Sequence, residues 1–321
     1  MNKRALPIVL LVCTMPFLMA QEGDYQKGLS YYKQGQYFKT IQEFEQIVKL
    51  HPDYESGHRI LGDSYLKIKD YEKATEAFQN ALRLKNDNFV SYYGLALAYY
   101  NSGRYQDVIP TLVKGESYAQ SPRDQYQTYH TRGSSYYNVN DFEQAISDLH
   151  KAISIQSGNS DDALQLGISY YRVGNDSEAE KYLQRALALD PAASAAKYYL
   201  SRLHYEEAID AIDAQNFGKA AAFLSEYVSE NPEDGEARFN LGLAQLFAEN
   251  LEIAEREFLE SARLMPENWG VYDRLGYVYE KQEKYDKALQ NYQTAHDIHQ
   301  DPQIQESLER VQERIRRMKS Q

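Results

Sequence analysis

Apolar side chains recur along most of this chain at helical spacing, and their order repeats. Between Gly62 and Ala81, a small residue is followed by two tyrosines, an alanine, a phenylalanine and another alanine, at intervals of three to six residues. Intervals of three and four place side chains on one face of a helix, so each copy predicts two amphipathic helices. Short turns of Gly, Asn or Asp, such as residues 101–103, are expected to join them.

The copies align on one small residue within the first helix of each pair. These residues are Gly28, Gly62, Ala96, Gly133, Gly167, Ala208, Gly242 and Gly276, spaced by 34, 34, 37, 34, 41, 34 and 34 residues. Self-similarity at a fixed period is the signature of a repeat architecture. Since five of the seven intervals are identical, the period is not a coincidence of composition.

This order resembles the tetratricopeptide repeat, whose pattern runs aromatic, Leu-Gly, Tyr, Ala, aromatic and Pro over 34 residues. The resemblance implies an all-α fold, a right-handed superhelical solenoid of paired antiparallel helices. Because one pair cannot cover its own apolar face, the pairs are expected to stack and to need polar caps. Eight repeats are expected, near residues 21–54, 55–88, 89–122, 126–159, 160–193, 201–234, 235–268 and 269–302.

Helix ends and the cap can also be predicted. Four prolines are expected to end second helices, because proline cannot continue a helix: Pro52, Pro191, Pro232 and Pro266. Residues 303–321 predict a capping helix whose apolar stripe is Ile304, Leu308, Val311, Ile315 and Met318. Its basic last turns, Arg314 to Lys319, are interpreted as a solvated cap that favours the helix dipole, with a basic docking patch as the alternative.

The two long intervals predict irregular junctions. Pro110 falls inside a second helix, where we expect a kink. Seven extra residues near 194–200 remain helix-forming, so a long first helix is expected from about Ala193 to Ala214. Three blocks follow, near residues 21–122, 123–193 and 194–302. Their junctions either bend or are rigid with an altered superhelical pitch.

The first twenty residues have the order of a secretory signal peptide. Lys3 and Arg4 precede an uncharged apolar run that ends at Ala20. An uncleaved anchor is the first alternative, although the run is shorter than a bilayer span. Lipidation of Cys13 is the second, although Val12 is large for such a site. Export is therefore expected, to the periplasm in the first place, with secretion or peripheral attachment to the envelope as alternatives.

Composition and charge narrow the class of function. Of 321 residues, 43% are apolar and 26% charged, and removal of Lys3 and Arg4 takes the net charge from −12 to −14. Such a charge disfavours nucleic acid as a partner. The processed chain has no cysteine and no further stretch of transmembrane length. His296 and His299 lack the other ligand and base of a zinc peptidase motif, and no nucleophile elbow or phosphate loop occurs. No metal, cofactor or enzymatic activity is expected.

The resemblance implies that first helices line a concave face where partners bind. The residues that this projection places there are Tyr25, Tyr32, Arg59, Tyr93, Tyr100, His130, Tyr137, Tyr171, Tyr205, Phe239, Phe247 and Tyr277. Tyrosine offers a large contact area with a polar tip, which suits a groove that grips peptides or helices. The alternative for each is packing between neighbouring repeats.

Two further observations bear on the partner. Some relatives hold a C-terminal carboxylate with a fixed set of Lys, Asn and Arg, but Tyr25, Leu29, Tyr93 and Leu97 stand where much of that clamp would be. A chaperone-tail function is therefore not expected. Residues 201–302 hold 21 acidic and 9 basic side chains, which indicates either a solvated surface or a docking face for a basic segment.

These patterns predict a non-enzymatic adaptor that binds protein or peptide segments in a bacterial envelope or secretion assembly. The alternatives are a periplasmic chaperone, a regulatory subunit of an envelope enzyme, and a structural protein that assembles with itself. The fold alone does not choose among them.

Overall fold

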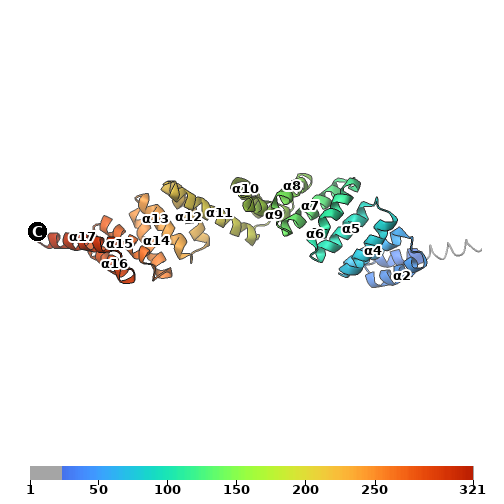
Figure 1. The fold of residues 1–321 in the computed structure, drawn as a ribbon, viewed down its shortest axis with the longest axis horizontal. Helices are drawn as coiled ribbons and strands as arrows, with labels where there is room; N and C mark the ends of the chain where they lie inside the picture. Colours follow the sequence, from blue (N-terminus) through green and yellow to red (C-terminus); the bar gives the residue numbers. More distant parts are fainter. Residues whose placement is uncertain (1–23, 321) are drawn as a thin grey trace, which may run out of the picture. The chain divides into compact units, whose positions relative to one another are not determined.

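The computed structural model describes residues 24–320, and this part of the chain consists of helices joined by short turns (Figure 1). The expected all-α fold is confirmed. The chain divides after Ala193 into two compact units, called here the N-terminal and the C-terminal unit. The signal peptide predicted for residues 1–20 lies outside the described residues.

The N-terminal unit is a solenoid of five helix pairs. It begins with helical residues 24–33, followed by α2 (Tyr37–Leu50), α3 (Glu55–Lys67), α4 (Tyr71–Leu84), α5 (Phe89–Asn101), α6 (Tyr105–Gly115), the 3-10 helix η1 (Glu116–Tyr118), α7 (Pro122–Asn138), α8 (Phe142–Ile155), α9 (Ser160–Arg172) and α10 (Asp176–Leu189). The first helices of successive pairs, α3, α5, α7 and α9, also pack on one another. They therefore share one face of the unit.

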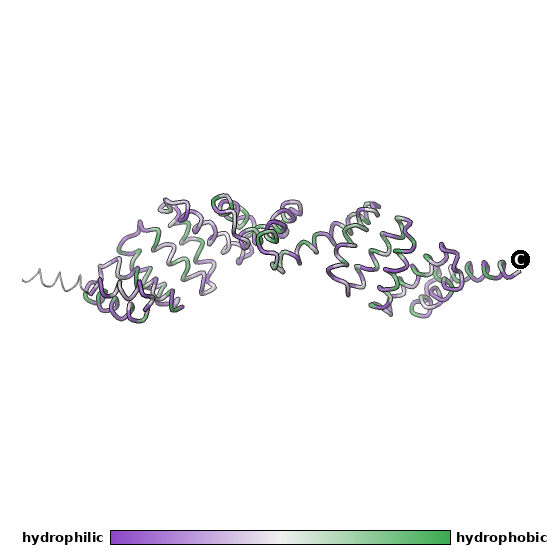
Figure 2. Tube along the Cα trace, turned by 180° about the vertical axis from the view of Figure 1, so that it is seen from behind, coloured by the Kyte–Doolittle hydropathy of each residue, from purple (hydrophilic) through white to green (hydrophobic). Residues whose placement is uncertain are grey.

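The C-terminal unit is built in the same way and ends in a cap. Its helices are α11 (Ser194–Asp213), α12 (Phe217–Glu230), α13 (Gly235–Phe247), α14 (Leu251–Leu264), α15 (Trp269–Lys281), α16 (Tyr285–Ile298) and α17 (Pro302–Lys319). The 20-residue α11 confirms the predicted long helix. Figure 2 shows hydrophobic and hydrophilic residues alternating along the helices of both units, as expected of amphipathic helices.

Packing inside a pair follows from the repeated small and aromatic residues. Phe78 of α4 is buried, and its ring lies where a Cβ on Gly62 would come within 2.9 Å of it. Ala74 and Ala81, on the same helix, are fully buried. Small residues thus let two helices approach while the ring fills the space between them, and burial of such a ring stabilises the fold by about 1.5–3 kcal/mol.

The junction between the third and fourth repeats corrects the expectation of three blocks. Helix α6 runs through Pro110 and ends at Gly115, where η1 begins. Tyr118 of η1 stacks on Tyr92 of α5 with 5.9 Å between ring centroids. Because η1 takes up the extra residues in this way, α7 still packs on both α5 and α6. The first two expected blocks are therefore one unit.

The cap α17 is held by apolar packing and by one ion pair. Ile304, Leu308 and Val311 are buried, whereas Met318 is 57% exposed, so the apolar stripe is shorter than expected. Arg310 donates through Nε and Nη2 to the two carboxylate oxygens of Glu280 in α15, each at 2.9 Å. These bonds hold the pKa of Glu280 below its usual 4.5.

Left-handed backbone recurs at one position in the turn inside each pair. Three repeats place glycine there: Gly35, Gly103 and Gly174 have φ of 72–77°. Five place another residue there: Lys69, Asn140, Gln215, Glu249 and Glu283 have φ of 57–65°. A side chain with a Cβ is strained in this region, whereas glycine is not.

Glu249→Gly and Glu283→Gly are therefore expected to raise the free energy of unfolding by about 0.5–1 kcal/mol each, after allowance for the greater freedom of glycine in the unfolded chain. Urea unfolding monitored by circular dichroism measures this change. Gly103→Ala is the opposite control and should be destabilising. A loss of stability in both glutamate variants would contradict the assignment of strain to these turns.

Candidate partner-binding groove

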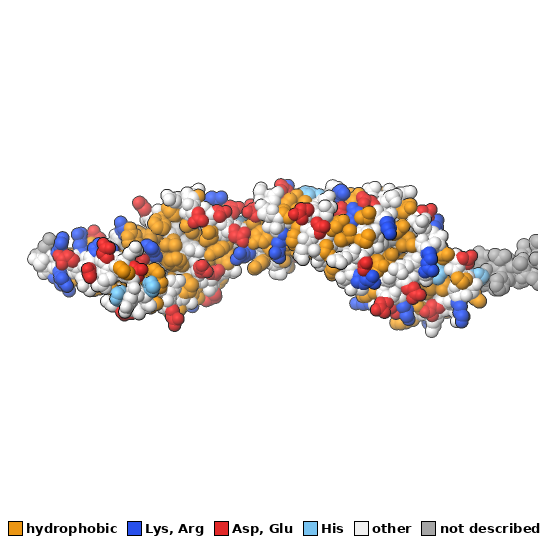
Figure 3. Space-filling view, viewed as in Figure 1, with side chains coloured by type: hydrophobic (Ala, Val, Ile, Leu, Met, Phe, Trp, Pro, Cys, Tyr) orange, Lys and Arg blue, Asp and Glu red, His pale blue; other side chains and the backbone are white. Residues whose placement is uncertain are grey.

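A groove of about 580 Å³ lies in the N-terminal unit, on the face that its first helices share. Its lining comes from helical residues 24–33, α3, α5 and the start of α7, together with Phe78 of α4. In Figure 3, hydrophobic side chains gather over α5 to α7 in this unit and over α12 to α14 in the C-terminal unit. The groove is thus built by four successive repeats of one unit.

Tyrosine rings wall the groove, and each is held by a second ring. Tyr25 meets Phe44 and Tyr54 edge to face, with centroids 5.7 and 5.8 Å apart. Tyr93 stacks on Phe89 at 5.8 Å. Each tyrosine is half-buried, so each supports the fold and still presents a surface. Preformed aromatic walls favour binding because few side-chain rotamers remain to be ordered.

The two groove carboxylates already have hydrogen-bond partners inside the protein. The Tyr32 hydroxyl donates to Asp63, and burial together with this bond raises the pKa of Tyr32. Asp124 accepts from the backbone N–H of Ser121 at 3.3 Å and completes the capping box of α7. Both carboxylates therefore act as acceptors for this chain's own groups.

The cations that line the groove have fewer hydrogen-bond and ion-pair partners within the protein than the groove carboxylates have. Arg59 is 3.8 Å from Glu55, and its Nε, though buried, has no hydrogen-bond partner among the described residues. Lys67 and Arg123 are exposed, and within residues 24–320 neither has a carboxylate at ion-pair distance. Three cations thus line the groove with little internal compensation.

Other predicted residues continue along the first helices beyond this groove. Tyr100 and Tyr137 pack edge to face on the residues that start their own second helices, Tyr105 at 5.3 Å and Phe142 at 6.1 Å. Tyr171 is half-buried near the end of α9. The rings of Tyr100 and Tyr137 therefore pack within their own repeats, whereas the alternative interpretation expected packing between neighbouring repeats.

His130 belongs to a polar cluster between α7 and α9. Its Nδ1 lies 2.6 Å from Oδ1 of the fully buried Asp162. Tyr126 donates to the other oxygen of Asp162 at 3.0 Å and stacks on the His130 ring. Burial raises the pKa of Tyr126 to about 12. This arrangement ties two first helices together.

In the C-terminal unit the remaining four predicted residues mostly pack against other rings. Tyr205 packs on Tyr227 at 4.8 Å, Phe239 lies 5.7 Å from the buried Phe258, and Phe247, 53% exposed, stacks on Phe217 at 4.8 Å. Tyr277 lies beneath the Lys281 ammonium. The predicted aromatic stripe is thus divided between two units, with its groove-lining part in the first.

The structure brings four of the predicted residues into one groove: Tyr25, Tyr32, Arg59 and Tyr93. Sequence reasoning missed their neighbours Asp63, Leu66, Lys67, Arg123 and Gln127. A usable signal exists for three of these, because Asp63, Leu66 and Lys67 follow Arg59 by four, seven and eight residues on one helix face. No such rule identifies Arg123, whose place depends on how α7 packs.

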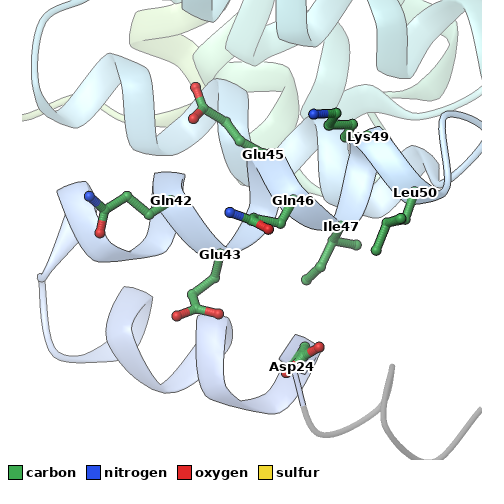
Figure 4. A pocket seen from close by; sticks show the side chains of 8 residues that line it. All are labelled: Asp24, Gln42, Glu43, Glu45, Gln46, Ile47, Lys49 and Leu50. Carbon is green, nitrogen blue, oxygen red and sulfur yellow. The ribbon is translucent and has the colours of Figure 1, made fainter. Parts of the chain in front are cut away.

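A second hollow, of about 760 Å³, lies over α2 beside Asp24. Figure 4 shows Glu43 pointing to the helix that begins at Asp24, whereas Glu45 points to the other side of α2. The charge of Glu43 is taken up by Lys27 at 2.6 Å. The side chains that line this second hollow do not converge on a common point. The tyrosine-walled groove is therefore the better candidate for a partner-binding site.

Within residues 24–320, no three His, Cys, Asp or Glu side chains lie together in a way that could hold a metal ion. Among the same residues, no helix is both long and apolar enough to cross a membrane.

Comparison with known proteins agrees with the repeat pattern. Models of the tetratricopeptide repeat match residues 22–54, 126–159, 161–193, 205–268 and 270–298, and a model described as TPR repeat matches residues 62–103. The matched segments cover part or all of every helix pair, and they leave unmatched α6 with η1, the start of α3 and the first half of α11.

Individual relatives are distant. The TPR repeat-containing protein MJ1428 of Methanocaldococcus jannaschii is 26% identical over 79% of this chain and 44% of its own length. DnaJ homolog subfamily C member 3 of Gallus gallus is 22% identical over 94% of this chain and 65% of its own length. The chain thus spans about half to two thirds of these relatives. A solved mutant of MamA is 23% identical, with a TM-score of 0.48 over 54% of this chain and 98% of that one.

Repeat period, paired helices and family matches agree along the chain. The protein belongs to the tetratricopeptide repeat family.

Proposed function

We propose that this protein is a non-enzymatic scaffold or adaptor that binds a peptide or helical segment of another protein in the groove of its N-terminal unit. The observation that carries the proposal is the groove itself, where half-buried tyrosines form walls held by other rings and cations remain available. Rigid aromatic anchors and arginine are the residue types that dominate binding energy at protein interfaces.

The proposed place of action is the bacterial cell envelope. It rests on the charged start and apolar run of the first twenty residues. An adaptor in that compartment would bring envelope or secretion components together through segments held in the groove. A fusion of residues 1–30 to a reporter that is active only outside the cytoplasm tests this part separately, and an inactive reporter would contradict it.

Blocking the groove without unfolding the unit tests the binding function. Val90 lines the groove and is 55% exposed, so Val90→Trp adds bulk there at little cost in folding. Val113 on α6 is 53% exposed and outside the groove lining, which makes Val113→Trp a matched control. Both variants should keep the free energy of unfolding within about 0.5 kcal/mol of the parent.

In-cell crosslinking followed by mass spectrometry is the measurement. We expect a defined partner protein to be captured by the parent and by Val113→Trp, and its yield to fall about tenfold or more in Val90→Trp. Equal capture by both variants would remove the site from this groove. Capture of this chain alone would support a self-assembling protein, and capture of many unfolded chains would support a chaperone.

A further inference from the structure

We infer that the segment bound in the N-terminal groove is acidic, with carboxylate side chains placed between apolar ones. This inference rests on the proposed function and adds the chemistry of the partner to it. Its basis is the imbalance between the cations and the carboxylates that line one groove.

The cations are available to a ligand. Lys67 lies in the last turn of α3 and Arg123 in the first turn of α7, and both are exposed without an ion pair among the described residues. Arg59 keeps one third of its side chain exposed, and among the described residues Glu55, at 3.8 Å, is its only carboxylate within ion-pair distance. Glu55 in turn accepts hydrogen bonds from Asn88 at 3.1 Å and Ser91 at 3.4 Å. It therefore compensates Arg59 only in part.

The groove carboxylates, in contrast, are already engaged. Asp63 accepts the Tyr32 hydroxyl, and Asp124 accepts a backbone N–H in the α7 capping box. A basic ligand would have to compete with these bonds, whereas an acidic ligand would meet free donors. Elsewhere in the unit, cations such as Lys27 and Arg132 have carboxylate partners at 2.6 Å. Other exposed cations of the unit, such as Lys49 and Lys114, also lack an ion pair among the described residues. Arg59, Lys67 and Arg123 differ from them because all three line one groove whose carboxylates are already hydrogen-bonded.

The apolar lining sets the other half of the expected motif. Leu29, Val90 and Leu97 lie in the same groove as the tyrosine rings, and each retains exposed surface. An occupant made only of acidic residues would leave this surface in water. A segment that alternates carboxylate and apolar side chains satisfies both kinds of surface, and opposite charges would also raise its rate of association.

Selection from a random 12-residue peptide library displayed on phage tests the inference, with the full chain as bait. Displayed peptides are fused at their C-termini, so only side-chain carboxylates are offered. We expect enriched peptides to be net negative and to contain Leu, Phe or similar residues. Affinity for synthetic copies should fall on the order of tenfold in Lys67→Glu/Arg123→Glu, and weaken as salt rises.

Lys49→Glu/Lys114→Glu is the matched control, since it makes the same change in net charge at exposed positions on α2 and α6 outside the groove. It should bind like the parent. Enrichment of neutral or basic peptides that Val90→Trp excludes would overturn the acidic motif while leaving the proposed function intact. No enrichment at all would count against both. Equal weakening by the two charge variants would show that only overall charge matters, which overturns the assignment to this groove.

Discussion

Replacement of Arg132 by leucine is expected to lower the free energy of unfolding by about 3–5 kcal/mol, the cost of leaving buried charge without its partner. Arg132 of α7 is 5% exposed and Asp148 of α8 is 3% exposed. The guanidinium donates to the two Asp148 oxygens at 2.6 and 3.0 Å and to Glu116 of η1 at 2.7 Å. Its removal leaves the buried Asp148 with only the half-exposed Lys151, at 3.6 Å, and leaves Glu116 of η1 with only its bond from Tyr129.

A double variant shows whether the loss of stability comes from an uncompensated buried charge or from lost packing. In the fifth repeat Leu166 occupies the place of Arg132, and in the second repeat Ala77 occupies the place of Asp148. Arg132→Leu/Asp148→Ala should therefore recover much of the loss, because it restores an apolar pair. If the single and double variants are equally unstable in urea unfolding, the loss of stability comes from altered packing and not from the unpaired charge.

The cost of Arg132→Leu should also depend on pH. Burial alone would raise the pKa of Glu116, but its bonds to Arg132 bring that pKa below the usual 4.5. A carboxylate with a lowered pKa in the folded state stabilises the fold above pH 4.5, and this contribution is lost as pH falls through the folded-state pKa. The difference in free energy of unfolding between the parent and Arg132→Leu should therefore become smaller as the pH is lowered from 7 to 3.5. A constant difference would show that Glu116 has no part in it.

Much of the fold follows from residues whose role is local. Gly62 and Phe78 belong to adjacent helices joined by one short turn, so the pattern of a single repeat predicts their contact. The length of α11 was predictable for the same reason, because the seven extra residues before Tyr205 favour helix. Repetition then multiplies one local rule along the chain, which is why paired helices could be predicted throughout.

The groove was predictable only in part, because its charge balance is a tertiary property. Helix periodicity predicts that Arg59 faces the groove. It does not predict that Asp63 accepts a hydrogen bond from Tyr32, which is 31 residues away. The unpaired state of Arg123 likewise depends on how α7 packs after η1. The sequence does give a signal for Arg132. It directly precedes Gly133, whereas the residue before the corresponding glycine in other repeats is leucine, as at Leu166 and Leu275.

Phe258→Ala is expected to destabilise the C-terminal unit by about 3–5 kcal/mol. The ring is fully buried, and it occupies the space into which a side chain on Gly242 would project, since a Cβ there would lie 2.6 Å from Phe258 Cε1. Removal of the ring leaves a cavity between α13 and α14 and takes support from Phe239, whose ring is 5.7 Å away.

Gly242→Ala supplies the complementary test. Alone it should cost about 1–3 kcal/mol, because the added methyl group forces the ring out of its place. Combined with Phe258→Ala it should cost less than the sum of the two single changes, since the methyl group then enters space that the ring has left. Strict additivity in urea unfolding would mean that the two positions do not share that space.

The N-terminal unit contains an equivalent glycine–phenylalanine pair, Gly62 and Phe78. Loss of the phenylalanine ring should affect peptide binding in that unit but not in the C-terminal one. Phe78 is packed against Gly62 and also against Gly94, and it lines the groove, whereas Phe258 belongs to the other unit. Phe78→Ala should therefore both lower stability and weaken binding of peptides selected on the groove. Phe258→Ala should lower stability by a similar amount and leave that binding unchanged. Loss of binding in both variants would show that peptide recognition needs the C-terminal unit as well, and would move the site beyond the groove described for the first.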